Sequence, residues 1–143
     1  MQPVTAHILY IEDHEDTREL ITLVLQQRNF EVTSAGTLEK AHSLASEGCF
    51  DLYLLDSWLP DGSGLDLCKR IREFDTVTPI LFYSAAAYEA DRDVALSCGA
   101  QAYLIKPSQT SELCNLVSSL IAGAREKEEH VVALHANNQM GCP

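Results

Sequence analysis

Five short apolar runs, separated by segments whose apolar residues recur at helical spacing, constrain this sequence more than any other feature. Four of the runs are nearly continuous in apolar character, which is typical of strands covered on both faces. Parallel strands need crossover connections, and these are right-handed, so the alternation predicts a parallel sheet with helices on both faces. The periodicity leaves the order of the strands open. The predicted strands cover residues 7–11, 30–35, 52–55, 80–83 and 102–105.

The predicted helices differ in how well they are anchored. The segment after the last strand has the clearest apolar face, because its apolar residues are spaced by three and four. The segment 88–97 is rich in alanine and poor in large apolar residues, so we expect the most mobile helix there. The other helices are expected at 37–47 and around two apolar faces. These faces are formed by Leu20, Ile21, Val24 and Leu25, and by Leu67, Cys68, Ile71 and Phe74.

The apolar pattern ends near residue 122, which sets the expected domain boundary. A chain of 143 residues with 46% hydrophobic residues has the usual size of one domain and enough apolar residues for one core. Gly123 predicts a helix end, and the REKEE run after it is well solvated. We therefore expect one domain over residues 1–122 and a flexible acidic and polar tail over 123–143, with a docking segment as the alternative.

The charge balance excludes some classes of partner. With 21 acidic and 10 basic residues, the chain has a formal net charge of -11. This argues against direct binding to nucleic acid and against a basic membrane-surface patch, and it favours a cationic partner or a divalent metal. No leader segment and no apolar run of membrane-spanning length is apparent, so we expect a soluble, cytoplasmic protein.

The cysteines suggest neither a disulfide framework nor a zinc site. They are odd in number, scattered, and free of CxxC pairs. We interpret them as small core residues in a reducing compartment. They are Cys49, Cys68, Cys98, Cys114 and Cys142.

Polar residues close four of the five predicted strands. Glu12 and Asp13 follow the first strand, Asp56 the third, Ser84 the fourth and Lys106 the fifth. In parallel α/β sheets the carboxyl ends of the strands form the ligand crevice, so these side chains are expected to meet. Carboxylates brought together repel by roughly 4 kcal/mol per pair at about 4 Å with an effective dielectric near 20. A lysine and a hard divalent ion, most naturally Mg²⁺, would offset that repulsion.

The same constellation suits phosphoryl transfer. That chemistry needs a carboxylate nucleophile, a metal that bridges phosphoryl oxygens, and lysine and hydroxyl donors to the other oxygens. Asp56 is the expected nucleophile, because it stands between the acidic pair and Lys106. Taken one at a time, these residues would be read as a solvated loop, a helix cap and an exposed lysine.

The chain resembles a two-component response regulator receiver domain from His7 to Ile121. The resemblance is carried by YIEDHED, by LYLLDSWLPDGSGLD with Asp56, by LFYSAAA with Ser84, and by AYLIKPS with Lys106. It implies a flavodoxin-like, doubly wound (βα)5 fold with a five-stranded parallel sheet of order 2-1-3-4-5.

The resemblance implies a phosphorylation switch. Asp56 would accept phosphate from a sensor histidine kinase or a histidine phosphotransfer protein. Asp13, Asp56 and the main-chain carbonyl of Trp58 would bind Mg²⁺, with Glu12 acting largely through water. Lys106 and Ser84 would hold the phosphoryl oxygens.

The resemblance also implies how the signal leaves the site. Ser84 would move toward the phosphate and Tyr103 would turn inward, which changes the surface around the fourth helix and fifth strand. The peptide bond before Pro107 would be cis. On its own, Tyr103 reads as an ordinary strand residue with its hydroxyl in water, and Pro107 as a trans proline that ends a strand.

Three positions depart from the common family pattern. Glu12 stands where the family often has Asp, which lengthens the side chain but keeps the charge. Trp58 is bulky at a position that influences loss of the phosphoryl group, and Ala86 has no group to orient a water. We hypothesise that the Trp58 indole shields the acyl phosphate and prolongs the signal. The alternative is that Trp58 packs over the loop with no effect on lifetime.

Three other classes of protein share part of this pattern. A haloacid-dehalogenase-like phosphohydrolase needs a second Asp where this chain has Trp58. A flavodoxin-like flavin carrier needs a phosphate loop after the first strand, where the acidic residues of this chain would repel phosphate. A constitutive receiver-like interaction module fits the sequence, and only phosphorylation of Asp56 separates it from a switch.

We expect no enzyme activity beyond the chain's own phosphorylation and dephosphorylation, and no output domain of its own. No helix-turn-helix or basic segment follows Ile121, so direct DNA binding is not expected. The downstream target is not identified by the sequence. Output by protein contact leaves three routes open: a phosphorelay, a target protein or kinase, and homodimerisation on activation.

Overall fold

The computed structural model describes residues 5–134, and these form a five-stranded parallel sheet of order β2-β1-β3-β6-β7. Counted in chain order, this is the expected flavodoxin-like order 2-1-3-4-5, which is thereby confirmed. The strands are β1 (His7–Ile11), β2 (Glu31–Ala35), β3 (Leu52–Leu55), β6 (Ile80–Ser84) and β7 (Ala102–Ile105). A two-stranded antiparallel ribbon, which the sequence analysis did not predict, is formed by β4 (Trp58–Leu59) and β5 (Gly62–Ser63).

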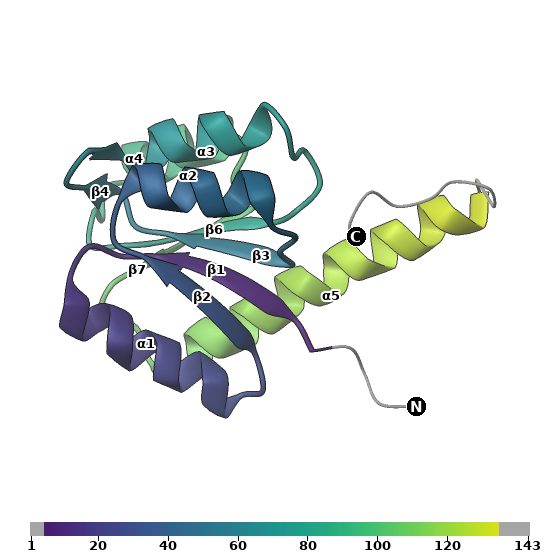
Figure 1. Cartoon of the computed structure of the whole chain (residues 1–143), viewed down its shortest axis with the longest axis horizontal. Coiled ribbons are helices and arrows are strands. Elements are labelled where there is room, and N and C mark those ends of the chain that lie inside the picture. The colour runs from purple at the N-terminus through teal and green to yellow at the C-terminus, as the bar shows by residue number, and fades with distance from the viewer. Residues whose placement is uncertain (1–4, 135–143) are drawn as a thin grey trace.

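Five helices cover the two faces of the sheet (Figure 1). They are α1 (Glu15–Gln27), α2 (Leu38–Glu47), α3 (Gly64–Arg72), α4 (Glu89–Ser97) and α5 (Thr110–Leu134). One core cluster joins the sheet to α1 and α5, and the other joins it to α2, α3 and α4. Along β1 the side chains alternate between the clusters, with Ile8 and Tyr10 in the first and Leu9 and Ile11 in the second. The predicted two-faced sheet is confirmed.

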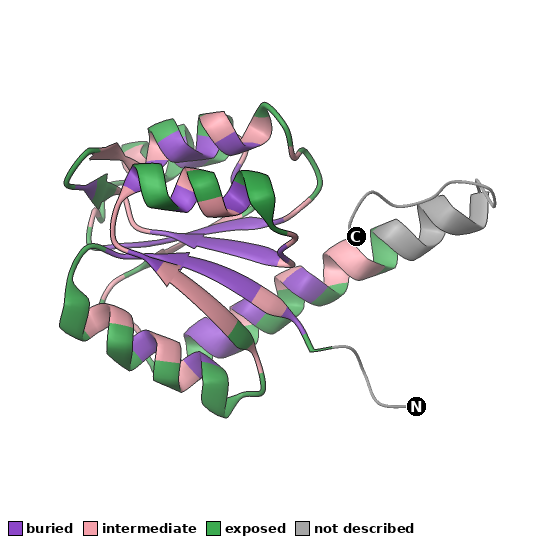
Figure 2. Ribbon diagram, in the orientation of Figure 1, coloured by how far each residue is buried: buried purple, intermediate pink, exposed green. Residues whose placement is uncertain are grey.

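The central strands are the best buried part of the molecule (Figure 2). Every residue of β3 and β6 is buried, whereas β2 and β7, at the two edges, are mostly half-buried. Among the helices, α4 buries only Ala95, in line with its lack of large apolar residues. The strands that carry Asp56 and Ser84 are therefore held by packing on both faces.

Polar caps explain where several helices begin. The side chain of Thr37 accepts a hydrogen bond from the main-chain N–H of Lys40, so α2 starts one residue after the predicted position. Ser63 caps α3 in the same way through Asp66. His14 caps α1, with its Nδ1 accepting from the N–H of Thr17 at 3.3 Å. Caps of this kind fix the entry of the chain from the strand ends into the helices.

The end of the last helix differs from the prediction. Gly123 does not end α5, which continues to Leu134. A glycine inside a helix costs about 1 kcal/mol relative to alanine, a penalty that a long helix with an anchored face tolerates. The domain boundary at residue 122 and the flexible tail stay predictions, and residues 135–143 lie outside the described residues. No helix within residues 5–134 has both the length and the apolarity needed to cross a membrane.

The cysteine prediction is confirmed in part. Cys68 and Cys114 are buried free thiols, and Cys98 is a half-buried free thiol. The prediction is wrong for Cys49, which is disulfide-bonded. A disulfide requires closeness in space, which spacing along the chain does not report.

Gly64 fixes how closely α3 approaches the end of β3. The N–H of Gly64 donates to the Ser57 carbonyl at 2.8 Å. A Cβ atom at position 64 would lie 2.0 Å from the main-chain oxygen of Asp56, closer than any real contact. Only glycine permits this approach, which holds the main chain at Asp56 in place.

We predict opposite effects for alanine at two glycines. Gly64→Ala should lower the free energy of unfolding by about 2 kcal/mol, because a rigid main-chain atom blocks the added methyl group. Gly123→Ala should raise it by up to about 1 kcal/mol, because it lies inside α5 and its added Cβ meets no described atom within 4 Å. Urea denaturation of both variants measures this. Equal stabilities would contradict the account of the Gly64 contact.

Candidate functional site

An acidic cluster lies where β1 and β3 end side by side. Glu12 and Asp13 follow β1, Asp56 follows β3, and the two strands are neighbours in the sheet. Each residue contributes one carboxylate oxygen to a group whose oxygens all lie within 4.8 Å of one another. The predicted meeting of these acids is confirmed. They differ in exposure, because Glu12 is buried, Asp56 is half-buried and Asp13 is exposed.

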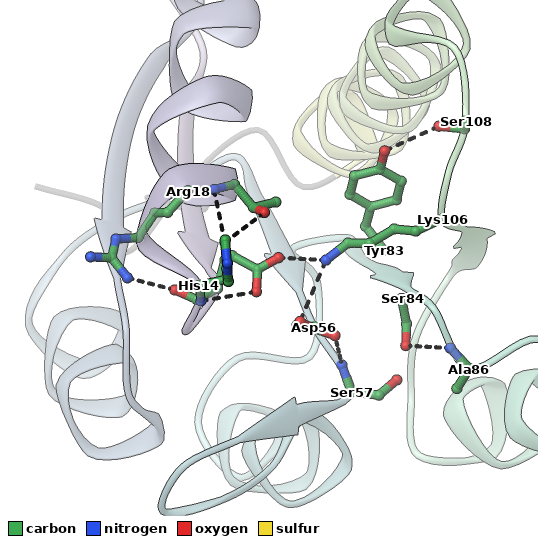
Figure 3. A network of polar contacts seen from close by, with 11 residues as sticks. His14, Arg18, Asp56, Ser57, Tyr83, Ser84, Ala86, Lys106 and Ser108 are labelled. Carbon is green, nitrogen blue, oxygen red and sulfur yellow. Dashed lines mark hydrogen bonds and ion pairs between the residues drawn. The ribbon is translucent and has the colours of Figure 1, made fainter.

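Lys106 joins two of the acids (Figure 3). Its Nζ donates a hydrogen bond to Glu12 Oε1 and a second, at 3.4 Å, to Asp56 Oδ2. Burial works to lower the pKa of Lys106, but the hydrogen bond with Glu12 and the charges of Asp56 and Glu12 outweigh it, so the pKa is raised. Lys106 therefore stays cationic and offsets part of the negative charge.

Main-chain contacts orient the acids. The N–H of Ser57 donates to Asp56 Oδ1 at 2.7 Å, and the N–H of His14 donates to Glu12 Oε2 at 3.3 Å. Arg18 Nη1 donates to the main-chain carbonyl of Glu12 at 2.8 Å. Sequence reasoning missed Ser57, which lies in the LYLLDSWLPDGSGLD segment but acts through its main chain, and it missed Arg18, which belongs to no motif. The only available signals were the position of Ser57 next to Asp56 and that of Arg18 in the first turns of α1.

Ser84 and Tyr103 meet at a single residue. The fully buried Ser84 accepts a hydrogen bond at Oγ from the N–H of Ala86 at 3.1 Å. The Tyr103 hydroxyl donates to the carbonyl of Ala86 at 2.6 Å and lies 3.5 Å from Ser57 Oγ. The Tyr103 ring stacks on Phe82, with centroids 5.9 Å apart. Tyr103 is thus directed inward toward the loop between β6 and α4, and its hydroxyl is hydrogen-bonded to the protein rather than to water.

The two remaining predicted residues have separate positions. Trp58 begins β4, pairs with Ser63, and is 70% exposed. Shielding of the acyl phosphate by its indole stays a prediction. The role of its carbonyl as a metal ligand stays a prediction. The peptide bond between Lys106 and Pro107 is cis, as the resemblance implied.

Asp61, in the loop after Asp56, accepts hydrogen bonds from the start of α2. Its Oδ1 accepts from the N–H of Leu38 at 2.7 Å and its Oδ2 from the N–H of Glu39 at 3.1 Å. These main-chain hydrogen bonds lower the pKa of Asp61. By composition, Pro60, Asp61 and Gly62 indicate only a generic turn, because a side chain that caps a distant helix leaves no local pattern. Asp61 thus ties the β4–β5 ribbon to the helix beside it.

Fold and site together define a class of protein. The site combines three carboxylates that suit a hard cation, an oriented aspartate at the end of a buried strand, and a lysine cation between two of the acids. It lies at the carboxyl edge of an open parallel sheet. This class comprises doubly wound α/β proteins whose strand ends carry an acidic cluster that could hold a metal ion.

Comparison with known proteins narrows the class to a family. Residues 8–118 match the response regulator receiver domain family, and the chain belongs to that family. A probable transcriptional regulatory protein of Picosynechococcus sp. is 37% identical over 115 residues, covering 76% of this chain and 46% of that protein. The transcriptional regulatory protein ResD of Bacillus subtilis is 30% identical over 119 residues, covering 83% of this chain and 49% of ResD. This chain thus spans about half the length of these relatives.

Solved structures agree with this assignment. The non-phosphorylated HemR receiver domain of Leptospira biflexa matches with a TM-score of 0.77 at 32% identity, covering 82% of this chain and 94% of that one. A CheY-like receiver domain protein of Methanospirillum hungatei matches with a TM-score of 0.83 at 21% identity, covering 87% and 99% of the two chains. The second likeness bears on the fold alone.

The Lys106 ion pairs generate a prediction about stability. Lys106→Met should lower the free energy of unfolding by about 3 kcal/mol, because Glu12 keeps a buried charge without its partner. Adding Glu12→Gln to Lys106→Met should restore most of that loss, since it removes the uncompensated charge. The exposed Lys40→Met is the matched control. Urea denaturation measures all four proteins, and equal stability of Lys106→Met and Lys40→Met would contradict the account.

Proposed function

We propose that this chain is a phosphoacceptor receiver, in which Asp56 takes a phosphoryl group and protein partners read the resulting change of surface. The observation that carries the proposal is the Lys106 ammonium placed between the carboxylates of Glu12 and Asp56. A carboxylate at the end of a rigid strand, oriented by Ser57 and beside a cation, is a positioned nucleophile.

The proposed reaction is a phosphoryl transfer from a phosphohistidine. A carboxylate oxygen of Asp56 forms a bond to phosphorus while the bond from phosphorus to the imidazole nitrogen breaks. The products are an acyl phosphate and a histidine, whose nitrogen keeps the electron pair. Lys106 and the Ser84 hydroxyl are the proposed donors to the phosphoryl oxygens, whose negative charge they stabilise.

Mg²⁺ is the proposed cofactor. The donor set fits it, because Glu12, Asp13 and Asp56 offer only carboxylate oxygens, which lie within 4.8 Å of one another. Asp13 and Asp56 are the proposed direct ligands together with the carbonyl of Trp58, and Glu12 acts largely through water. When bound, the ion supplies positive charge to the phosphoryl oxygens.

Ala86 supports a route by which phosphorylation reaches the surface. Ser84 holds the N–H of Ala86 and Tyr103 holds its carbonyl, so both switch residues bond to one peptide segment. If Ser84 turns toward a phosphoryl group, it releases the N–H of Ala86 and the loop before α4 is free to shift. Tyr103 links that shift to β7. The proposed output surface is therefore α4 and β7.

The proposed partners follow from this mechanism. The donor is a sensor histidine kinase or a histidine phosphotransfer protein, which places the chain in the cytoplasm beside it. The output partner is a protein that contacts α4 and β7, with homodimerisation on activation as one form of that contact. Direct contact with nucleic acid or a membrane forms no part of the proposal. The chain is not proposed to turn over any substrate beyond its own phosphoryl group.

A second candidate function is a constitutive interaction module. The inward placement of Tyr103 favours it, because the hydroxyl is already bonded to Ala86. In that case the output surface needs no phosphoryl group. The two functions differ only in whether Asp56 accepts phosphate.

Intact mass after incubation with acetyl phosphate and Mg²⁺ tests the proposed function. We expect one acid-stable, base-labile phosphoryl adduct, which disappears when EDTA removes Mg²⁺ and in Asp56→Asn. The exposed Asp66→Asn is the matched control and should keep the adduct. If neither acetyl phosphate nor a phosphohistidine protein gives an adduct, the proposal is wrong and the interaction module is favoured.

Trp58 generates a prediction about signal lifetime. Trp58→Asn should increase the rate of phosphoryl loss severalfold, because an exposed indole two residues from Asp56 is replaced by a small group that admits and orients water. Trp58→Phe, which keeps a ring, should change the rate less. Decay of the adduct mass over time measures all three proteins. An unchanged rate in Trp58→Asn would rule out shielding.

A further inference from the structure

Tyr83 contacts Lys106 from the side opposite the acids. It lies in β6 directly before Ser84 and is 6% exposed, in the core cluster beside α1 and α5. Lys106 Nζ lies 5.2 Å from the centroid of its ring. Its hydroxyl accepts a hydrogen bond from Ser108 Oγ at 3.3 Å. Figure 3 shows the ring beside Lys106 and the hydroxyl directed to Ser108.

We propose that Tyr83 is a positioning residue for Lys106, with its ring face holding the ammonium group and its hydroxyl holding the segment 106–108. The part of this inference that concerns phosphoryl transfer rests on the proposed function. The contact between the ring and the ammonium group stands independently of it.

The Tyr83 ring gives the Lys106 ammonium group both a fixed position and an electrostatic partner. Lysine carries its charge on a flexible four-carbon chain, so a fixed position requires contacts from more than one side. Glu12 and Asp56 supply the polar side, and a neutral aliphatic residue in place of Tyr83 would leave the other side without an electrostatic partner. The negative face of an aromatic ring attracts a cation while keeping the apolar contact with the core.

The hydroxyl gives the same residue a second contact. Ser108 lies two residues after Lys106, so Tyr83 contacts the chain on both sides of Pro107. A tyrosine at the top of a buried strand suits this task, because its ring is apolar and its tip is polar. Because Tyr83 in β6 contacts both Lys106 and Ser108, the Lys106 ammonium group is limited in how far it can shift toward Glu12 and away from Asp56.

Three variants separate positioning from simple core packing. Tyr83→Leu keeps an apolar side chain but removes the ring face. Tyr83→Phe keeps the ring and removes the acceptor for Ser108, and Ser108→Ala removes the same hydrogen bond from the other end. Combining Tyr83→Leu with Lys106→Met shows whether the effect of the ring depends on the ammonium group.

The first measurement is a double-mutant cycle on stability by urea denaturation. We expect Tyr83→Leu to lower the folding equilibrium constant roughly fivefold more in the Lys106 protein than in the Lys106→Met protein. A residue that only packs the core would lose the same amount in both. Equal losses overturn the proposal, and this cycle needs no phosphorylation.

The second measurement is the initial rate of phosphorylation of Asp56 by acetyl phosphate. We expect Tyr83→Leu to slow it roughly fivefold, whereas Tyr83→Phe and Ser108→Ala slow it equally and less. An unchanged rate in Tyr83→Leu overturns the positioning role. If wild-type protein accepts no phosphate, the proposed function fails. The double-mutant cycle on stability then still tests whether the Tyr83 ring interacts with the Lys106 ammonium group.

The third measurement is proton NMR of the wild-type protein, which needs no variant to fold. The ring should shift the Lys106 ε-methylene protons upfield of those of the exposed Lys40. Tyr83→Phe should keep this shift and Tyr83→Leu should abolish it. Coincident Lys106 and Lys40 signals in wild-type protein would overturn the proposal.

Discussion

The pairing of one ammonium group with two carboxylates at the sheet edge is the interaction on which the site depends. Glu12, Asp13 and Asp56 lie close enough to repel strongly, and Lys106 offsets part of that charge. The fold makes the arrangement possible, because β1 and β3 are neighbours that packing on both faces holds rigid. The main chain at these strand ends therefore does not separate to relieve the repulsion. The negative charge that remains would suit a divalent cation.

The features that could be predicted from the sequence are those that depend on packing, because packing requires apolar residues at regular positions. Continuous apolar runs marked β1, β3, β6 and β7, because buried strands tolerate few polar residues. The order of the strands came only from the family resemblance, since a run looks the same whichever strand lies beside it. The expectation that Glu12, Asp56 and Lys106 meet was correct. In a parallel sheet all strands run in the same direction, so their carboxyl ends lie at one edge.

The missed features depend on proximity that no local pattern reports. Arg18 contacts the main chain of Glu12 from a different element, and Tyr83 contacts Lys106 and Ser108, which are distant from it in the chain. The helix end predicted at Gly123 was wrong because the anchoring of α5 outweighs the low helix propensity of one glycine. Asp61 looked like a turn residue, although it caps α2 across the loop. In each case tertiary contacts decide what local preference leaves open.

A crystal structure grown with Mg²⁺ and beryllofluoride, a tetrahedral mimic of a phosphoryl group, tests the central claim most directly. The account predicts beryllium on a carboxylate oxygen of Asp56, Mg²⁺ on oxygens of Asp13 and Asp56, and fluorides in contact with Lys106 and Ser84. Ser84 would then have released the N–H of Ala86. Mg²⁺ bound elsewhere, or an unmodified Asp56 with Lys106 still bonded to its carboxylate and to that of Glu12, would contradict the account.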